Sequence, residues 1–286
     1  MPEQITLAAW ADRYLSDIRT LKSCYSVSSV IRAFSARDPS RPLADLRGSD
    51  IHDYAQSRLA AGIRSTTINR ELSVLSAAIN HACRRWGVSV TENPVKYQWL
   101  RAAPLRLRYL DRIEADRLIA AADALRPVLG DFVRLALHTG CRKTELLTLR
   151  WSDVDLLRRF FVLRPENTKT ARRRAVPLNK TALGALHALK ARGPVGAEWV
   201  FSKPSGDRVK SLDWLFRKAV KEAGISDFRI HDLRHTCASW LVSEGVELVK
   251  VRDLLGHTSI KMTERYAHLM PSKLHSAVEV LDMFAA

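Results

Sequence analysis

Apolar residues recur at helical spacing through the first ninety residues of the chain. The pattern predicts four helices: residues 7–18, residues 26–36, a third from Ser49 or Asp50 to a stop at Gly62, and a fourth over residues 65–87. The following segment contains two prolines, several cations and little periodicity. We therefore predict a helical domain over residues 1–93 and a basic linker over residues 94–108.

From residue 109 onward, helical patterns alternate with one stretch of a different period. Helical spacing runs from a capping residue at Asp111, continues up to Gly140, restarts at Thr144, and returns over residues 181–193 and 211–224. The segments RFFVLRP and RRRAVPL are instead typical of two short strands, which ENTKTA joins as a β-hairpin. The predicted fold class is mainly α, with a small β-sheet or hairpin in the second domain.

The last sixty residues carry four more helical patterns. They predict a helix over residues 228–245, a second over 248–255 that ends at Gly256, a third from Thr258 or Ser259 through His268, and a last one over 272–284. One face of the last helix is strongly apolar. We expect it to dock, either on its own domain or on a neighbouring subunit.

Composition supports a protein of the cell interior with a substantial core. Hydrophobic residues make up 47% of the 286 residues, and no apolar stretch is long enough to span a bilayer. The N-terminus lacks the basic region and apolar run of a secretory signal. Four widely spaced cysteines form no CxxC pair. Free thiols in a reducing cytosol are the simplest account, so we expect a cytoplasmic protein without membrane partners.

The chain is strongly basic, with a net charge of +16 and a pI near 10.1. Residues 1–104 carry +5 and the remaining residues carry +11. Two basic halves suit a protein that grips a polyanion such as double-stranded DNA. Membranes and other polyanions would suit the charge as well, and many of the charges are interspersed as on an ordinary solvated surface.

The candidate chemistry is concentrated in residues 228–269. This stretch contains His231, Arg234, His257 and Tyr266. A guanidinium matches two phosphate oxygens, and a phenol is a plausible nucleophile if its developing charge is neutralised. Tyr266 alone would equally suit a core aromatic residue, and His231 alone a helix-start residue that binds backbone. The convergence of these residue types favours phosphoryl transfer through a phosphotyrosine.

A metal site is the competing interpretation of HDLRH. His231 and His235 are four residues apart on the predicted helix, as two zinc ligands would be. The zinc-protease motif has glutamate in the second position, and Asp232 is one methylene shorter. Arg234 would also place a fixed positive charge beside the cation. We therefore predict no metal and no other cofactor, and a structural hydrogen-bonding role for His235.

Three charged residues outside this stretch complete the candidate site. Arg142 follows the turn at Gly140 and precedes a helix start, which favours anion binding, and Glu145 is spaced to hold it. The alternative is an internal Arg–Glu pair that only fixes the turn. Lys169 belongs to the predicted hairpin tip, from which a lysine can reach a phosphate or donate a proton. A solvated loop is the structural alternative.

Two groups of polar residues are candidates for contact with DNA backbone or base edges. One is the basic run of the hairpin, and the other is the early polar face of the fourth helix. These residues are Arg172, Arg173 and Arg174 in the first group, and Arg64, Asn69 and Arg70 in the second. Both groups would equally suit an exposed surface.

Four motifs occur in one order between residues 138 and 269: HTGCRKTELLTLRW, NTKTARRRAVPL, HDLRHTCASWLVSEG and LLGHTSIKMTERYAHL. Together they resemble the tyrosine recombinases, the phage-integrase family of site-specific DNA recombinases. The resemblance implies a helical core-DNA-binding domain over residues 1–93, a linker over 94–108, and an α+β catalytic domain with a C-terminal helix over 109–286. It also implies that the arm-site-binding domain of lambda-type integrases is absent.

The resemblance implies a role for each residue that matches the family's motifs. Tyr266 would attack the scissile phosphate, giving a 3′-phosphotyrosine and a free 5′-hydroxyl. Arg142 and Arg234 would clamp the phosphate oxygens without a metal. Lys169 would protonate the leaving 5′-oxygen.

The same resemblance extends to the two histidines and to assembly. His231 would assist proton transfer at the nucleophile, His257 would hydrogen-bond the phosphate, and Glu145 would support the site. Family members act without ATP, as a homo-tetramer on two DNA duplexes through a Holliday junction. An accessory DNA-bending protein is compatible with this pattern, and such an enzyme would act at the nucleoid.

Three other protein classes compete with this interpretation. A type I topoisomerase shares the chemistry, a non-cutting DNA-binding protein would share the charge, and a zinc hydrolase would need a bound metal. The presence of every expected catalytic residue type favours an active recombinase.

Overall fold

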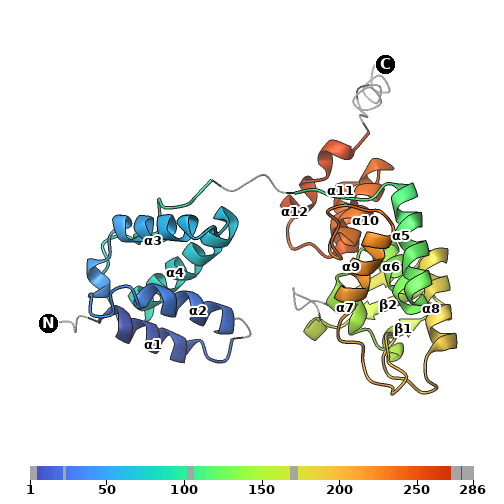
Figure 1. Ribbon diagram of the computed structural model, residues 1–286, viewed down its shortest axis with the longest axis horizontal. Helices are drawn as coiled ribbons and strands as arrows, with labels where there is room; N and C mark the ends of the chain where they lie inside the picture. The colour runs from blue at the N-terminus through green and yellow to red at the C-terminus, as the bar shows by residue number, and fades with distance from the viewer. Residues whose placement is uncertain (1–4, 22–23, 102–105, 168–172, 272–277, 279–286) are drawn as a thin grey trace, which may run out of the picture. The chain divides into compact units, whose positions relative to one another are not determined.

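The structure, a computed structural model, describes residues 5–21, 24–101, 106–167, 173–271 and 278. The chain divides into two compact units, Met1–Leu105 and Arg106–Ala286 (Figure 1). Each unit has its own hydrophobic core. Among the described residues, no helix is both long and apolar enough to cross a bilayer.

The described residues of the first unit form a bundle of four α-helices. They are α1 (Leu7–Asp17), α2 (Cys24–Ser35), α3 (Gly48–Ala60) and α4 (Ser65–Trp86). The predicted periodicity is confirmed, because the apolar stripe of each helix faces one core. Trp10 is fully buried there, and its indole nitrogen donates to the carbonyl of Ala78 across the core.

The predicted caps of α3 and α4 are wrong. α3 begins at Gly48 after Arg47, and Asp50 accepts the backbone N–H of Arg47 from within the first turn. α4 begins at Ser65 after Arg64, without a side-chain cap. A serine near the start of a helical pattern predicts a capping residue. The cap is, however, the last residue before the helix, and the pattern alone does not locate that residue to within one position.

The segment predicted as a linker contributes to both units. Val95 is fully buried in the core of the first unit. In the second unit, Arg106 pairs with Asp232 at 2.9 Å, and Arg108 pairs with Glu114 at 2.5 Å.

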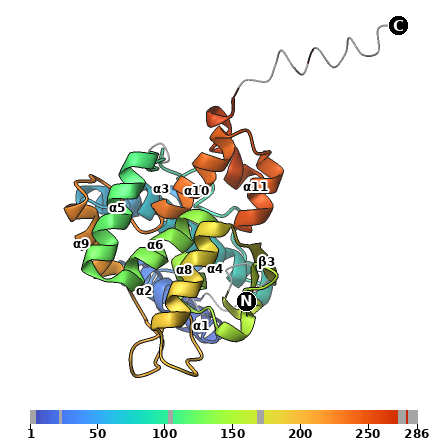
Figure 2. The same cartoon turned by 90° about the vertical axis from the view of Figure 1, so that its right-hand side faces the viewer.

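The second unit is built around α6 (Pro127–Thr139), whose residues are largely buried. α6 lies between α5 (Arg112–Leu125) and α8 (Lys180–Arg192), as Figure 2 shows, and it also packs against α10 (Asp232–Ser243). The α9 helix (Asp213–Glu222) packs against α5. α5 starts at the predicted cap, because the carboxylate of Asp111 accepts the backbone N–H of Glu114 at 2.7 Å.

A small antiparallel sheet lies at the edge of this unit, in the order β1 (Val154–Asp155), β2 (Phe160–Leu163), β3 (Arg174–Pro177). The predicted hairpin of β2 and β3 is confirmed, with Phe161 opposite Val176. Both of these side chains are fully buried against the helices. The two-residue strand β1 was not predicted, because so short a strand shows no alternation.

The last part of the unit contains α10 (Asp232–Ser243), α11 (Leu248–Leu255), α12 (Lys261–Glu264) and a 3-10 turn, η4 (Ala267–Leu269). The predicted helix over 228–245 begins later than expected, at Asp232. The carboxylate of Asp232 accepts the backbone N–H of Arg229 at 2.8 Å, so the residues before it form a turn.

The prediction of one helix through His268 is also wrong. α12 ends at Glu264, and tight bonds follow, from the N–H of Tyr266 to the carbonyl of Thr263 and from Leu269 to Tyr266. This bend turns the Tyr266 ring inward, where it is 1% exposed. The predicted helix over 272–284 lies outside the described residues except for position 278.

Candidate active site

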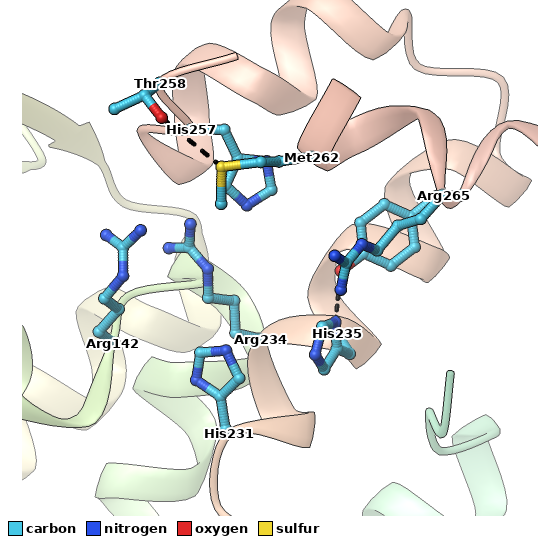
Figure 3. Close-up of a pocket in the computed structure, with 9 residues that line it drawn as sticks. Arg142, His231, Arg234, His235, His257, Thr258, Met262 and Arg265 are labelled. Atoms are coloured by element: carbon cyan, nitrogen blue, oxygen red, sulfur yellow. Dashed lines mark hydrogen bonds between the residues drawn. The ribbon is translucent and has the colours of Figure 1, made fainter. Parts of the chain in front are cut away.

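One cavity of about 290 Å³ gathers most of the candidate residues (Figure 3). Its lining is Arg142, His231, Arg234, His235, His257, Thr258, Met262, Arg265 and Tyr266. These side chains come from the turn before α7 (Lys143–Leu147), the start of α10, the end of α11 and the bend after α12. Segments separated by more than a hundred residues therefore meet at one place.

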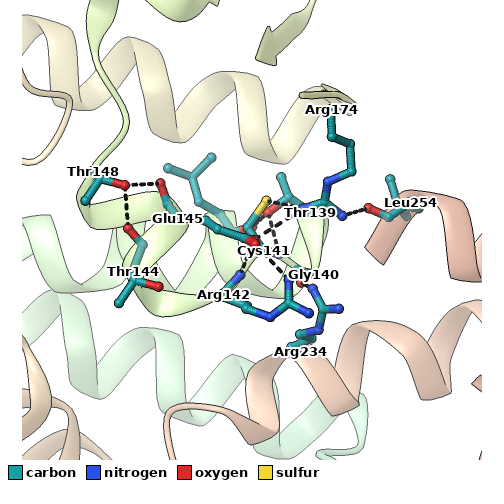
Figure 4. A network of polar contacts seen from close by, with 11 residues as sticks. Thr139, Gly140, Cys141, Arg142, Thr144, Glu145, Thr148, Arg174, Arg234 and Leu254 are labelled. Atoms are coloured by element: carbon teal, nitrogen blue, oxygen red, sulfur yellow. Dashed lines mark hydrogen bonds and ion pairs between the residues drawn. The ribbon is translucent and has the colours of Figure 1, made fainter. Parts of the chain in front are cut away.

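The turn between α6 and α7 places Arg142 at the cavity. Gly140 ends α6 with a φ of +62°, and a Cβ there would lie 2.3 Å from a methyl carbon of Leu255, so both backbone and space require glycine. Glu145, 1% exposed, accepts the backbone N–H and Nη1 of Arg142, both at 2.8 Å (Figure 4). Glu145 thus fixes both the main chain and the side chain of Arg142.

Arg174 completes this network. Its Nη2 donates to Glu145 at 3.2 Å, and its Nη1 donates to the carbonyl of Leu254 at the end of α11 (Figure 4). The side chain is only 13% exposed. Arg174, predicted as a DNA contact, here ties β3 to α7 and α11.

Arg234 is buried without a carboxylate of its own. Its side chain extends from α10, and Nη1 donates to the carbonyl of Gly140 at 2.8 Å. Nη2 is buried and has no hydrogen-bond partner among the residues that the structure describes. Burial, and then the charge of Arg142, lower the pKa of Arg234 to about 10. A buried donor of this kind is costly unless an anion completes it.

The hydroxyl of Tyr266 contacts His235, the residue for which only a structural role was predicted. The hydroxyl oxygen lies 2.5 Å from Nδ1 of His235. The ring of His231 stands perpendicular to that of His235, with centroids 5.2 Å apart. Burial raises the pKa of Tyr266 to about 12, against the opposing charges of Arg265 and Arg234. The phenol is therefore protonated at neutral pH.

His257 follows the left-handed Gly256 that ends α11. Its Nδ1 lies 2.8 Å from the hydroxyl of Thr263. Burial, and then Arg234 and Arg142, lower the pKa of His257 to about 3. Desolvation, followed by the same two arginines, also lowers the pKa of His231. Both imidazoles are therefore neutral at physiological pH.

Arg265 is a cavity residue that was missed in the sequence. It lines the same cavity as Tyr266 (Figure 3), and its Nε is buried without a hydrogen-bond partner among the described residues. Its position immediately before the candidate nucleophile was the available signal. For His235, the signal was its four-residue spacing from His231.

The remaining predicted residues lie elsewhere. Lys169 and Arg172 fall outside the described residues. Arg173 is exposed beside β3, Arg64 is exposed immediately before α4, and Arg70 is exposed on α4.

The Asn69 side chain has a structural contact in the first unit. Its amide nitrogen donates to the carbonyl of Leu100 at 2.8 Å, and its amide oxygen accepts the Leu100 N–H at 2.9 Å. This pair of bonds holds the chain after α4 against that helix.

The histidines of the cavity do not form a metal-binding cluster in the described part of the chain. No group of three or more histidine, cysteine, aspartate or glutamate residues is placed there to hold an ion. His235, one of the two candidate zinc ligands, has its Nδ1 at the phenol instead.

Known proteins with similar sequences point to one family. The sequence profile described as "Phage integrase family" matches residues 108–273, which include the whole cavity. The integrase of Salmonella phage P22 is 35% identical over 224 residues, covering 74% of this chain and 56% of its own length. Tyrosine recombinase XerC of Mycobacterium tuberculosis is 31% identical over 284 residues, covering 93% of this chain and 90% of its own.

Solved structures share the fold. The integrase of transposon Tn1549 in complex with transposon right-end DNA has a TM-score of 0.81 at 20% identity, covering 99% of this chain and 100% of that one. A lambda integrase tetramer bound to a Holliday junction has a TM-score of 0.73 at 25% identity, covering 92% and 78%. The chain spans 56–64% of the length of the phage integrases of P22, HP1 and 186. With a matching profile over more than half of its residues and a XerC relative over nearly all of them, the chain belongs to the phage integrase family of tyrosine recombinases.

Proposed function

We propose that this protein is a site-specific DNA recombinase that cleaves and rejoins strands through a 3′-phosphotyrosine. The observation that carries the proposal is the cavity, where the Tyr266 phenol lies with Arg142, Arg234 and Arg265. Arg234 keeps a buried nitrogen that has no hydrogen-bond partner among the described residues. A scissile phosphate is an anion of suitable size and charge for this place. Its non-bridging oxygens would complete the donor set of Arg234.

The reaction would use the cavity residues as follows. Tyr266 attacks the phosphorus, and the 5′-oxygen leaves. Negative charge develops on the phosphate oxygens, where Arg142 and Arg234 stabilise it. If His257 accepts the Thr263 hydroxyl at Nδ1, its hydrogen is on Nε2, which then donates to the phosphate.

Two proton-transfer roles from the family pattern extend this proposal. Lys169 protonates the leaving 5′-oxygen. This role requires the predicted hairpin tip, to which Lys169 belongs, to contact the DNA. His231 assists proton transfer near the nucleophile, a role supported by its neutral ring beside that of His235. Since the phosphodiester energy is kept in the covalent link, rejoining needs no ATP.

The larger assembly follows from the same chemistry. Exchange between two duplexes requires four active sites, so we propose a homo-tetramer, as in the lambda integrase complex on a Holliday junction. Residues 1–93 would bind core DNA together with residues 94–108 and the catalytic domain 109–286, with Arg64, Arg70 and Arg173 as exposed candidates for phosphate contact. The enzyme would act at the nucleoid, with or without an accessory DNA-bending protein.

A capture experiment tests the proposal without a known target. The protein is incubated in excess EDTA with randomly nicked DNA fragments, whose short cleavage products diffuse away and leave the covalent link behind. Protein-linked DNA is then isolated under denaturing conditions and sequenced. Wild type should yield linked DNA with a common sequence and Tyr266→Phe none. Linkage through a different tyrosine, or none from either protein, would contradict the assignment.

Activity on the captured sequence then separates the recombinase from a topoisomerase. A plasmid with two copies of that sequence should give recombinant products with the wild-type protein. Relaxation of supercoils without recombinants would instead indicate a topoisomerase.

A further inference from the structure

We infer that His235 accepts the hydroxyl proton of Tyr266 when this tyrosine attacks DNA, an inference that rests on the proposed function. The family pattern gives a proton-transfer role to His231, whereas the phenol oxygen is 2.5 Å from Nδ1 of His235. A proton acceptor must first be within hydrogen-bond reach of the proton that it takes. His235 meets this condition in the structure.

The surroundings of His235 keep its lone pair available. Burial, then the neighbouring His231, lower the pKa of His235 to about 4, while Asp232 opposes the shift and Arg265 and Arg234 add to it. Asp232 is itself held by Arg106 at 2.9 Å and by the N–H of Arg229 at 2.8 Å. The imidazole is therefore neutral at pH 7, and in the tautomer with hydrogen on Nε2 its Nδ1 accepts from the phenol.

The low pKa does not prevent transfer during the reaction. As the bond to phosphorus forms, the phenol oxygen becomes an ester oxygen and loses its basicity. A bound phosphate also adds negative charge beside the arginines, which offsets their repulsion of a protonated histidine. The proton therefore moves with the attack and not before it.

The step balances in both directions. The Oη–P bond forms, the P–O5′ bond breaks, and the phenol proton passes to Nδ1 of His235. The leaving 5′-oxygen takes its proton from a separate acid, for which Lys169 is proposed above. On rejoining, the 5′-hydroxyl attacks, the phenol oxygen leaves, and His235 returns the proton to Tyr266.

Two substitutions distinguish proton transfer from simple holding. His235→Ala removes both functions, whereas His235→Asn retains an amide oxygen that can accept a hydrogen bond near the position of Nδ1 but takes no proton. We expect both variants to form the covalent adduct about 10²- to 10⁴-fold more slowly than wild type on the captured DNA. Their rates should rise with pH between 6 and 9, because the phenol then loses its proton to solvent, while the wild-type rate stays nearly constant.

A fluorinated tyrosine at position 266 provides a second readout. Its lower phenol pKa reduces the need for a proton acceptor, so the deficit of His235→Ala should shrink. The exposed His187 on α8 offers a matched control, since His187→Ala should react at the wild-type rate. Thermal unfolding checks that each variant is folded.

The possible results separate this inference from the proposed function. If wild type forms an adduct and His235→Asn does so equally fast, His235 only positions the phenol and the inference is wrong. A wild-type rate in His235→Ala would also overturn it. If wild type itself forms no adduct, the proposed function fails first.

Discussion

The two arginines that flank the α6–α7 turn have opposite surroundings. Arg142 donates to Glu145 from its backbone and from Nη1, whereas Arg234 donates only to the carbonyl of Gly140 and keeps a buried Nη2 without a partner among the described residues. Pairing with a carboxylate holds a charged side chain in place. A buried donor without a partner retains its capacity for an anion. The fold thus holds Arg142 in place through a carboxylate and leaves Nη2 of Arg234 able to bind an anion.

The same difference extends across the cavity. On the Arg142 side, Glu145 also binds Arg174, which reaches the end of α11 (Figure 4). On the opposite side, Arg265 has a buried Nε without a partner in the described part of the chain (Figure 3). Substitutions on the first side should therefore reduce stability, and those on the second should reduce reaction rate.

The largest effect is expected from Glu145→Ala. This change leaves Arg142 and Arg174, 18% and 13% exposed, without their carboxylate. Removing one partner of a buried ion pair typically destabilises a protein by about 3–5 kcal/mol. Urea denaturation should show a loss of this size, and adduct formation should fall as well because Arg142 loses its position.

A surface glutamate provides the control for this change. Glu247 pairs with Lys250 at 3.2 Å, and its side chain is 70% exposed. Glu247→Ala should change the free energy of unfolding by about 1 kcal/mol or less. If Glu145→Ala is no more destabilising than this control, the network does not support the fold.

The second prediction concerns Arg234→Ala. Loss of one donor to a transition-state oxyanion typically lowers the rate by about 10²–10³-fold, so adduct formation should fall by this factor. The free energy of unfolding should change less than in Glu145→Ala, because no carboxylate loses its partner. DNA binding, measured by gel shift, should be nearly unchanged. If Arg234→Ala is strongly destabilised but forms the adduct at the wild-type rate, Arg234 supports the fold and not the reaction, and the proposed difference between Arg142 and Arg234 is wrong.

Much of the fold follows from local patterns in the sequence. Gly140 and Gly256 mark the ends of α6 and α11, because each adopts a left-handed conformation that other residues rarely take. The apolar stripe of α4 and the β2–β3 pairing also follow from periodicity. These features depend on residues that are close in the sequence, so the spacing of glycines and apolar residues is enough to predict them.

The parts that could not be predicted depend on contacts between distant segments. The contact of Tyr266 with His235 depends on the bend after α12, which no periodicity signals. Arg174 belongs to the same basic run as Arg173, yet only the position of α11 turns it inward. Asn69 likewise belongs to a polar face of the predicted helix. In the structure, its side-chain amide is hydrogen-bonded to the backbone of Leu100, where the chain returns to α4.

The smallest effect on stability is expected from acid, through the histidines near Arg234. The pKa of His257 is lowered to about 3 and that of His235 to about 4, whereas an unfolded histidine titrates near 6.5. Between these values the unfolded chain binds protons that the folded protein does not. Stability is therefore fully present above pH 6.5 and decreases as the pH falls towards 4. Because both rings are only partly buried, solvent screening should keep the loss for each histidine well below the limiting value of about 1.4 kcal/mol per pH unit.

Sulfate connects this pH dependence to the comparison of the two arginines. A bound anion would complete the donors of Arg234 and offset the charges that lower the pKa of His257. Urea denaturation at pH 5, 6 and 7 should then show a smaller pH dependence in sulfate than in chloride of equal ionic strength. Arg234→Ala should lose most of this difference, since the guanidinium that would bind the anion is gone. An equal sulfate effect in both proteins would show that the anion binds elsewhere, and that the Arg234 side of the cavity is not the anion site.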